Sequence, residues 1–568
     1  MTNETRSSNV EMFQVARWPV SSFGFRHSFG FRHSSFLIVL LLSADASLAQ
    51  TQKWVSQHAL DAPEVPAQVR AEARGTPWRS PERGPVAGLS VLASEKSGAV
   101  WLGSDQGAAR FDPRAGFRWD RWQYFCGRRW LSDDRVRNIC LEESGASRKV
   151  WVRTENGVSL IEWRPMTLEG KAGYFDERIE QRHVRHGLVA GSRLRTAGDL
   201  STNEKVSNDN DGLWTAMYLG AQAYRYAVTR DPEARARAQR ALRALMRLEE
   251  ITGVPGLLAR SFVSTREPPP RDGVWHSTPD GQWLWKGDTS SDELVGHYFA
   301  YAVYFDLVAD DGEKGAIRKV VGRITDYLIR NDYDLIDVTG KPTRWGEWSE
   351  RFFRTEEGKY EAPLRSLELL SFLKTAHHIT GSPKYAEAYR DRVQRGYADH
   401  VPFYRRWPGG GEINFSDDEL AYLSYQPLLN YEKDSKLRKI YLAGLRYTWS
   451  QVRSDMNPLW NYIFVAGGGG RMSRAIREES RRTLERIPMD MIDWGVRNSH
   501  RLDVQLQKDK DRHDYRQLTA VLAPDERPVG KWNGNPYRPD GGSGGHAEED
   551  GAYFLLPYWM GRYHGWVR

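Results

Sequence analysis

The sequence is poor in cysteine and has no long block of charge of one sign. Only two cysteines occur in 568 residues, Cys126 and Cys140, and neither a cysteine–histidine metal spacing nor a cysteine nucleophile signature surrounds them. The 81 basic and 74 acidic side chains leave a net charge of +7 that is not gathered into a long basic run. Cysteine chemistry and nucleic-acid binding are therefore not expected.

Long apolar runs are also missing. The apolar run Phe36–Leu42 is far shorter than the roughly 20 residues that span a bilayer. Arginines precede it and the small residues 46–49 follow it, which predicts a signal peptide over 1–49 and an exported protein, periplasmic or secreted, without stable membrane insertion. A duplicated segment makes this leader long, so Met12 is an alternative start. Export leaves open whether the two cysteines form a disulfide.

Aromatic residues, by contrast, are abundant, with 22 Trp, 26 Tyr and 20 Phe. Their flat rings suit either the packing of a large helical core or the binding of sugar faces. The length predicts two or three domains. The composition alone does not show whether these aromatic rings pack in the core or bind sugars.

The first part of the predicted mature chain has β character. Residues 50–88 are polar and interrupted by proline, which predicts a loose lead-in segment. Over 89–169, the stretches around Trp101 and Trp151 each contain a short strand, an Asp-Gln-Gly or Glu-Asn-Gly turn and a second strand. The spacing of 50 residues between these tryptophans falls in the range of propeller blades, but two copies are too few for a closed propeller.

Helical periodicity begins near residue 170 and continues to 568. Leu213, Met217, Ala221 and Tyr224 form one stripe, and Asp231-Pro opens the next helix with a cap and a proline at its first position. The same couplet returns at 289–308 with 313–330, at 361–380 with 383–396 and at 417–430 with 434–452, with further helical segments expected in 471–484 and 546–565. We therefore predict a mainly α protein, an (α/α)6 toroid preceded by a short β-rich domain with propeller-like repeats.

Polar and aromatic clusters stand in loops that precede the expected inner helices. In a toroid these loops meet at one open end, and six such clusters are what a carbohydrate cleft requires. They lie at 208–214, 283–297, 341–348, 457–462, 493–501 and 544–550.

Three of these segments resemble a known family. Residues 206–218, 285–297 and 340–346, following the propeller-like repeats, look like the L-rhamnose-α-1,4-D-glucuronate lyase family of polysaccharide lyases. The resemblance implies a propeller joined to an (α/α)6 toroid, an acidic polysaccharide or oligosaccharide substrate, and β-elimination at a glucuronate. The presence of only two blade repeats departs from this pattern.

β-Elimination needs a cation at the uronate carboxylate, a base and an acid. We expect Arg497 to neutralise the carboxylate, His297 or His500 to act as base, and Tyr462 to act as acid or, beside an arginine, as base. The predicted substrate-binding residues are Trp214, Asp211, Asp292, Arg344, Trp345, Trp460, Asn461, Asn498, Arg501 and His546.

Structural roles compete with these assignments. Asp211 and Asp292 could only cap their helices, His297 could line the inner wall, and the tryptophans could belong to the core. Asn208, Asn210 and Asp211 offer oxygen ligands of the kind that calcium takes, without the helix–loop–helix pattern of a calcium loop. No cofactor is certain from the sequence, and calcium is the possible one.

Two other functions remain open. The same toroid could host a glycoside hydrolase that uses paired carboxylates, drawn from Asp211, Asp292 and Glu347. Alternatively, the propeller-like repeats suit a non-catalytic glycan-binding or sensor protein.

Overall fold

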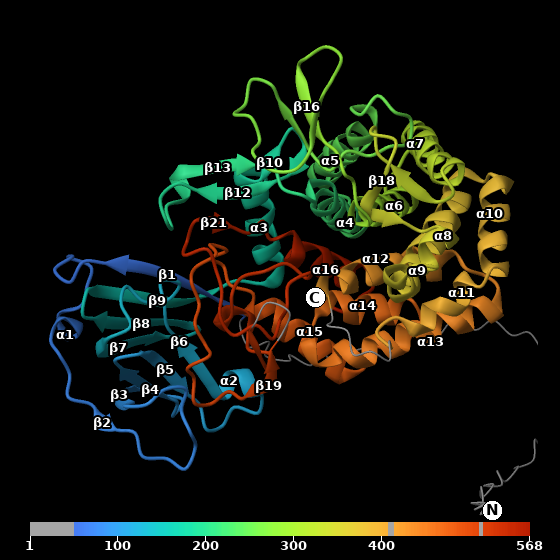
Figure 1. The fold of residues 1–568 in the computed structure, drawn as a ribbon. Helices are drawn as coiled ribbons and strands as arrows, with labels where there is room; N and C mark the ends of the chain where they lie inside the picture. Colours follow the sequence, from blue (N-terminus) through green and yellow to red (C-terminus); the bar gives the residue numbers. More distant parts are fainter. Residues whose placement is uncertain (1–49, 407–413, 511–514) are drawn as a thin grey trace, which may run out of the picture. The chain divides into compact units, whose positions relative to one another are not determined.

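The computed structural model describes residues 50–406, 414–510 and 515–568 (Figure 1). The predicted signal peptide, 1–49, and the alternative start at Met12 lie outside the described residues. Across the described ranges, no helix is both long and apolar enough to cross a membrane.

Two antiparallel sheets form the N-terminal part (Figure 1). In the first, the strand order follows the chain from β2 to β6; in the second, the order is β1, β9, β8, β7. The strands are β1 (Thr51–His58), β2 (Thr76–Pro77), β3 (Ser90–Ser94), β4 (Val100–Ser104), β5 (Gly107–Phe111), β6 (Trp122–Phe125), β7 (Val136–Ser144), β8 (Ser147–Thr154) and β9 (Gly157–Pro165), with the one-turn helices α1 (Ala67–Arg70) and α2 (Arg118–Arg121).

The two sheets repeat the same internal structure. Trp101 on β4 donates its indole N–H to Glu95 at 2.9 Å, and Trp151 on β8 donates to Glu142 at 2.8 Å. Both tryptophans are buried, and Trp101 stacks on Phe125 at a ring distance of 5.1 Å. The predicted hairpins are confirmed, and packing explains these two tryptophans.

The expected loose lead-in, 50–88, proves to be part of this fold. β1 pairs with β9 along its full length, from Thr51 opposite Pro165 to His58 opposite Val158, and so completes the second sheet. The prediction of a loose segment is wrong for β1, because the polar residues of β1 alternate as they do in an edge strand. That pattern can be recognised only once the partner strand is known. Both cysteines are free thiols.

The remainder of the chain folds into the predicted (α/α)6 toroid. Its inner helices are α4 (Asp211–Thr229), α6 (Ser291–Leu307), α9 (Glu356–Thr380), α12 (Phe415–Tyr431), α14 (Pro458–Ala466) and α16 (Ala552–Tyr563). Its outer helices are α3 (Leu168–Arg182), α5 (Pro232–Glu250), α7 (Asp311–Arg330), α10 (Pro383–Gln394), followed by α11 (Tyr397–His400), α13 (Ser435–Val452) and α15 (Arg474–Arg486). Each inner helix contacts the next, and α16 closes the ring against α4.

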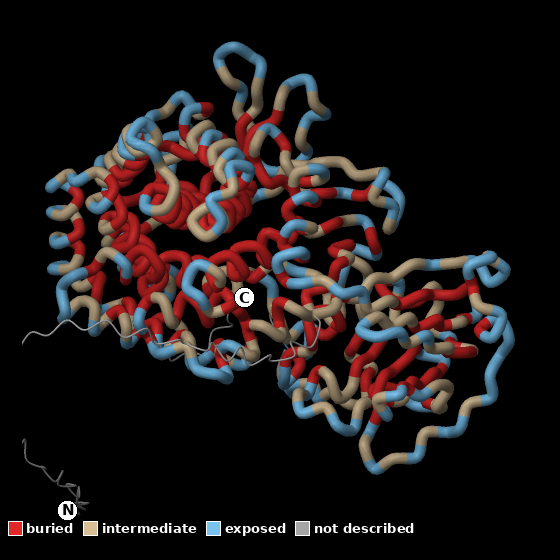
Figure 2. The backbone as a smooth tube through the Cα atoms, turned by 180° about the vertical axis from the view of Figure 1, so that it is seen from behind, coloured by how far each residue is buried: buried red, intermediate tan, exposed pale blue. Residues whose placement is uncertain are grey.

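Inner and outer helices differ in their apolar surface. In α4 every residue from 211 to 224 is buried, and α6 is buried almost all round, as Figure 2 shows for the helices inside the ring. Outer helix α5 buries one stripe that includes Leu242, Leu245 and Leu248. A helix that is apolar all round has neighbours on every side, so these patterns separate the two layers.

Two helices were not placed by the sequence. Helix α14 lies where a loop cluster was expected, although Asn457 caps it by accepting from the amides of Leu459 and Trp460, with Pro458 at its first position. Helix α3 packs on α16 and supplies the outer partner of the last inner helix. The segments 471–484 and 546–565 therefore contribute one helix each, α15 and α16.

Short strands and turns lie between the helices. They are β10 (Val184–Arg185), β11 (Leu188–Val189), β12 (Gly191–Leu194), β13 (Asn203–Val206), β14 (Phe262–Ser264), β15 (Trp275–Ser277), β16 (Trp283–Lys286), β17 (Asp334–Ile336), β18 (Pro342–Glu347), β19 (Leu506–Lys510), β20 (Arg516–Leu518) and β21 (Ala547–Glu548), with helix α8 (Glu350–Phe353).

A buried ion network joins the sheets to the toroid. Lys53 of β1 and Arg486 of α15 each lie 2.7 Å from a carboxylate oxygen of Asp525. Burial opposes the charge of Asp525, but the two cations outweigh that effect and hold its pKa well below its usual range. These largely buried ion pairs therefore attach the β-rich part to the helices.

Candidate functional site in the toroid mouth

Acidic side chains from the N-terminal ends of several inner helices meet at one end of the ring. They are Asp211 of α4, Asp292 and Glu293 of α6, Glu419 of α12 and Asp550, which immediately precedes α16, and their charges influence one another. Helix N-termini carry a partial positive charge and attract carboxylates, which favours this placement. We call these five residues the mouth carboxyl groups.

Glu419 and Glu293 are the mouth carboxyl groups whose two oxygens are buried without a hydrogen-bond partner among the described residues. The Glu419 side chain is fully buried. Burial, reinforced by the negative charge of Asp292 and only partly opposed by Lys531, raises its pKa from 4.5 to about 8. Glu419 is therefore protonated at neutral pH.

Asp292 has a different environment. It is partly exposed at the start of α6 and accepts hydrogen bonds from the Ser290 hydroxyl at 2.7 Å and the Asn210 amide at 3.3 Å. Two carboxyl groups with contrasting surroundings thus face the same region.

Lys531 supplies a positive charge to the mouth from the long segment that precedes α16. Its ammonium lies 2.9 Å from Asp550 and 3.9 Å from the ring centre of Trp214. Burial disfavours the ammonium, but the carboxylates of Asp550 and Glu549 outweigh burial and raise the pKa of Lys531. Lys531 is therefore a fixed cation, and its charge also holds the pKa of Asp550 below its usual range against burial.

Glu293 lies against the backbone of the neighbouring helix. A Cβ added to Gly212 would come within 1.8 Å of Glu293 Oε2, so only glycine leaves room for this carboxyl group. Burial raises the pKa of Glu293 well above its usual range, with partial opposition from Arg260. Close packing of α4 on α6 therefore produces a second neutral carboxyl group behind Asp292.

Aromatic rings flank the mouth carboxyl groups. Trp460 of α14 stacks on Tyr422 of α12 with ring centres 4.6 Å apart. A cavity of about 150 Å³ lies between Trp460, Lys531 and Trp532. Most of its lining comes from the segment 527–538, and none of the mouth carboxyl groups lines it.

A second acidic group lies between α9 and α12. Arg365 pairs with Glu361 at 2.8 Å and with Glu368 at 3.2 Å, and Trp348 donates its indole N–H to Glu368 at 2.8 Å. Burial and then the charge of Glu361 raise the pKa of the partly exposed Asp417 to about 8. Asp417 is therefore a second carboxyl group that is protonated at neutral pH.

Four of the residues predicted from the sequence do meet at the mouth, namely Asp211, Asp292, Trp214 and Trp460. Asp211 is buried, with its carboxylate held by Arg185 and the Ser261 hydroxyl, and burial raises its pKa to about 6. Trp214 and Trp460 are 8% and 2% exposed, so their faces are covered by protein. Of the two predicted carboxyl groups at the mouth, Asp292 is partly exposed and Asp211 is buried.

Three predicted residues point between the two layers of helices. His297 bonds to the carbonyl oxygens of Glu293 and of Leu245 on α5, and burial lowers its pKa to about 4. Asn461 accepts from the Trp449 indole and donates to Ser480, on outer helices. Tyr462 is fully buried beside Trp566. Their contacts are those of a helix–helix interface.

Four predicted residues lie close together at 497–501, in the segment between α15 and α16. Asn498 donates to the carbonyl oxygens of Glu526 and Pro539, and Arg501 pairs with Glu526 and Asp503. His500 contacts the Tyr124 hydroxyl of β6 at 3.3 Å, and Arg497 is exposed. The structure therefore does not bring His297, Tyr462, Arg497 and His500 together.

The remaining predicted residues are peripheral. Trp345 on β18 is 38% exposed, with the guanidinium of the exposed Arg344 4.6 Å from its ring centre. His546 is exposed and bonds to the carbonyl oxygen of Leu194. Glu347, proposed as one of a carboxylate pair, lies on β18, where burial and Asp334 raise its pKa.

The suggested calcium ligands are engaged with one another. Asn208 accepts from the amide of Asn210 at 2.8 Å, and its own amide donates to Asp211. Within the described ranges, no group of three or more His, Cys, Asp or Glu side chains could hold a metal ion.

Sequence reasoning missed Glu419, Lys531 and Asp417. The run Phe415-Ser-Asp-Asp-Glu419 at the start of a helix was an available signal for the two carboxyl groups, because acidic residues cluster in first turns. Lys531 stands in an irregular segment with no local signal.

Comparison with known proteins shows only distant similarity. No family model and no curated protein matches the chain. It is similar to the solved structure of a sugar epimerase from a ruminal bacterium (10% identity, 69% of this chain, 97% of the other, TM-score 0.36). It is also similar to AaCel9A in complex with cellobiose-like isofagomine (10%, 84% and 94%, 0.40) and to cellobiose 2-epimerase from Spirochaeta thermophila DSM 6192 (12%, 70% and 98%, 0.35).

The predicted membership of the rhamnose–glucuronate lyase family is wrong: no family model and no curated protein supports it, and the solved structures named above are sugar epimerases and AaCel9A. The predicted lyase activity and the predicted glucuronate and rhamnose in its substrate are therefore wrong as well. Two of the quoted motifs lead into the starts of α4 and α6, and the third lies on the turn and strand at β18.

Proposed function

We propose that the protein is a glycoside hydrolase of the (α/α)6 class, with Glu419 as the general acid and Asp292 as the general base. The observation that carries the proposal is the buried, unpartnered carboxyl group of Glu419 beside the hydrogen-bonded carboxylate of Asp292. A buried, protonated carboxyl group suits the role of acid, and a partly exposed carboxyl group that water can reach suits the role of base.

These environments determine which group gives a proton and which group takes one. Glu419 donates its proton to the glycosidic oxygen as the bond from that oxygen to the anomeric carbon breaks. A water molecule forms the new bond to the anomeric carbon, and Asp292 takes the proton that this water releases. Lys531 keeps its positive charge throughout, because the carboxylate of Asp550 stays beside it.

The charges at the mouth leave no excess of positive charge that would attract an acidic glycan. Glu419 and Glu293 are neutral and Asp211 is paired with Arg185, so the remaining carboxylates, Asp292 and Asp550, are opposed by Lys531 alone. The cavity of about 150 Å³ is smaller than the roughly 300–1,000 Å³ of typical ligand pockets. None of the mouth carboxyl groups lines this cavity, and Glu419 is fully buried, so in the proposal a sugar reaches Glu419 only after the groups that cover it have moved.

The experiment is hydrolysis of neutral oligosaccharides by the purified protein, measured as new reducing ends and as products that together contain one added water. Glu419→Gln and Asp292→Asn should each lower kcat/KM by about 10²–10⁴-fold. Because Glu419 must be protonated, wild-type kcat/KM should fall as the pH rises above about 8.

Matched controls lie at the other ends of the same helices. Glu432, the C-cap of α12, pairs with Lys374, and Asp306 of α6 pairs with His378. Glu432→Gln and Asp306→Asn should keep near-normal activity in the folded fraction. Undiminished hydrolysis by both mouth variants would contradict the assignment, and saturable binding without turnover would instead support a glycan-binding protein.

A further inference from the structure

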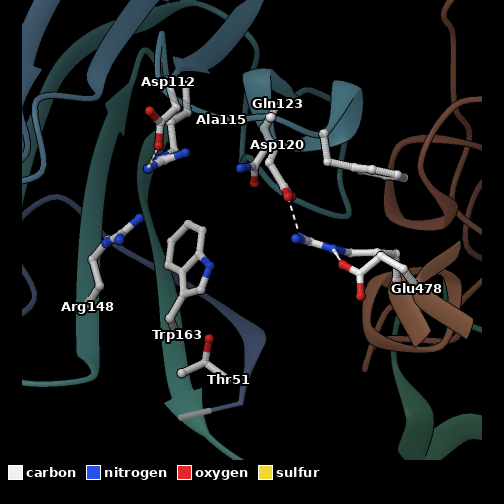
Figure 3. A pocket seen from close by; sticks show the side chains of 12 residues that line it. Thr51, Asp112, Ala115, Asp120, Gln123, Arg148, Trp163 and Glu478 are labelled. Atoms are coloured by element: carbon white, nitrogen blue, oxygen red, sulfur yellow. Dashed lines mark hydrogen bonds and ion pairs between the residues drawn. The ribbon is translucent and has the colours of Figure 1, made fainter. Parts of the chain in front are cut away.

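A second cavity, of about 640 Å³, lies between the two sheets and outer helix α15 (Figure 3). Its size falls within the range of small-ligand pockets. Strands β1, β5, β6, β8 and β9 line one side, and Glu478 and Arg482 of α15 line the other. None of the groups at the toroid mouth belongs to it.

Trp163 of β9 stands in this cavity, as Figure 3 shows. Its ring packs edge-on against Trp101 at 6.0 Å, and the Arg148 guanidinium lies 5.2 Å from its centre. Its indole N–H makes no hydrogen bond to the part of the chain that the structure describes, and the side chain is partly exposed. A tryptophan ring with an unused N–H offers an apolar platform with a polar edge.

Gln123 of β6 provides the strongest indication of a ligand. It is only 7% exposed and lines the cavity, yet its amide has no hydrogen-bond partner among the described residues. In Figure 3 the amide points into the space between Asp112 and Trp163. The amide atoms are not among the fully buried groups without a partner, so they are open to the cavity, and because an amide both donates and accepts, a ligand with hydroxyl groups could bond to it.

The charges of the lining select the class of ligand. Three arginines, Arg110, Arg148 and Arg482, are matched by Asp112, Asp120 and Glu478. Buried Glu95 also accepts from Arg110 at 2.6 Å and from Arg148 at 2.8 Å, and Arg482 pairs with Asp120. The cavity therefore has no excess positive charge with which to hold an anion, while its paired groups can still bond to hydroxyl groups.

We propose that this cavity is a binding site for a sugar unit of a neutral glycan, with Trp163 as the platform and Gln123 as a hydrogen-bonding residue. The site is separate from the toroid mouth and does not depend on the hydrolase proposal. It would hold a polysaccharide chain on the protein without taking part in bond cleavage.

The test uses binding stoichiometry in the Glu419→Gln background, which prevents turnover. Cellohexaose, xylohexaose, mannohexaose and maltohexaose are titrated by calorimetry, with trigalacturonate as the acidic comparator. Adding Trp163→Ala should remove one site per chain, and Gln123→Met, which keeps the side-chain volume, should weaken that site by about 5–10-fold. If the mouth binds no sugar, the same change takes the count from one to zero, so the two proposals fail separately.

The control is Trp54→Ala, because Trp54 lies on β1, packs on Tyr174 and does not line the cavity. It should leave the number of sites unchanged. Gln123→Met decides the question if Trp163→Ala does not fold, as judged by circular dichroism. The proposal is overturned if none of the four neutral sugars binds, if binding survives both variants unchanged, or if trigalacturonate binds more tightly than the neutral sugars.

Discussion

Replacing Glu419 by glutamine should make the protein more stable at neutral pH while removing its activity. The carboxyl group is fully buried and has no hydrogen-bond partner within the described ranges, and its pKa rises from 4.5 to about 8 on folding. Unfolded chains release this proton near pH 4.5, whereas folded chains keep it until about pH 8. Between these two pH values the carboxyl group is ionised in unfolded chains and protonated in folded chains. The free energy of unfolding of the wild type therefore falls as the pH rises.

The magnitude follows from the two pKa values. Each pH unit within the window changes the free energy of unfolding by about 1.4 kcal/mol, so at pH 7 the wild type has lost about 3 kcal/mol through this group. Glutamine does not titrate and avoids this loss. Its amide introduces its own hydrogen-bonding cost, but that cost does not vary with pH. The slope of the stability difference against pH therefore isolates the carboxyl group.

The assay is denaturant unfolding of wild type and Glu419→Gln at pH 5, 6, 7 and 8. The difference in the free energy of unfolding should move in favour of the variant by about 1.4 kcal/mol per pH unit. Asp550→Asn is the opposing control, because Lys531 outweighs burial and holds the pKa of Asp550 below 3.8. The stability contributed by Asp550 is present above that value and lost below it, so its removal should destabilise at pH 7. A flat difference for Glu419→Gln would refute the burial argument.

Two further predictions concern packing and ion pairing. Asp525→Asn should lower the free energy of unfolding at pH 7 by about 3–5 kcal/mol, because it leaves Lys53 and Arg486 buried without their shared partner; denaturant unfolding measures this, and a loss below 1 kcal/mol would contradict it. Gly212→Ala should lower the free energy of unfolding by about 1–3 kcal/mol, because the new Cβ would meet the Glu293 carboxyl group. In thermal unfolding, the double variant with Glu293→Ala should recover part of that loss. Additive losses would show that the two residues do not interact.

Retention of a destabilising carboxyl group is consistent with use of the site. A buried polar group without a partner lowers stability, and natural proteins keep such groups mainly where chemistry needs them. Glu419 is such a position at the toroid mouth, whereas the Gln123 amide is open to the second cavity. Each leads to a different proposal, one catalytic and one for binding.

Local patterns were sufficient for most of the helices. Asp231-Pro232 and Ser382-Pro383 mark helix starts, and the stripe through Leu213 and Met217 is buried as expected. The tight Asp-Gln-Gly turn likewise joins β4 to β5. These features depend on residues within a few positions of one another, so they are readable from the chain alone.

Only the tertiary structure decided which residues meet. Asp292, Glu419 and Lys531 are far apart in sequence and converge because three different segments end at the same mouth. The same ring turned His297 and Tyr462 into helix-interface residues and left Arg497 exposed. The low cysteine content and the balanced charge could be seen from the composition alone. The pKa of Glu419 could not, because desolvation and distant charges exist only once the chain has folded.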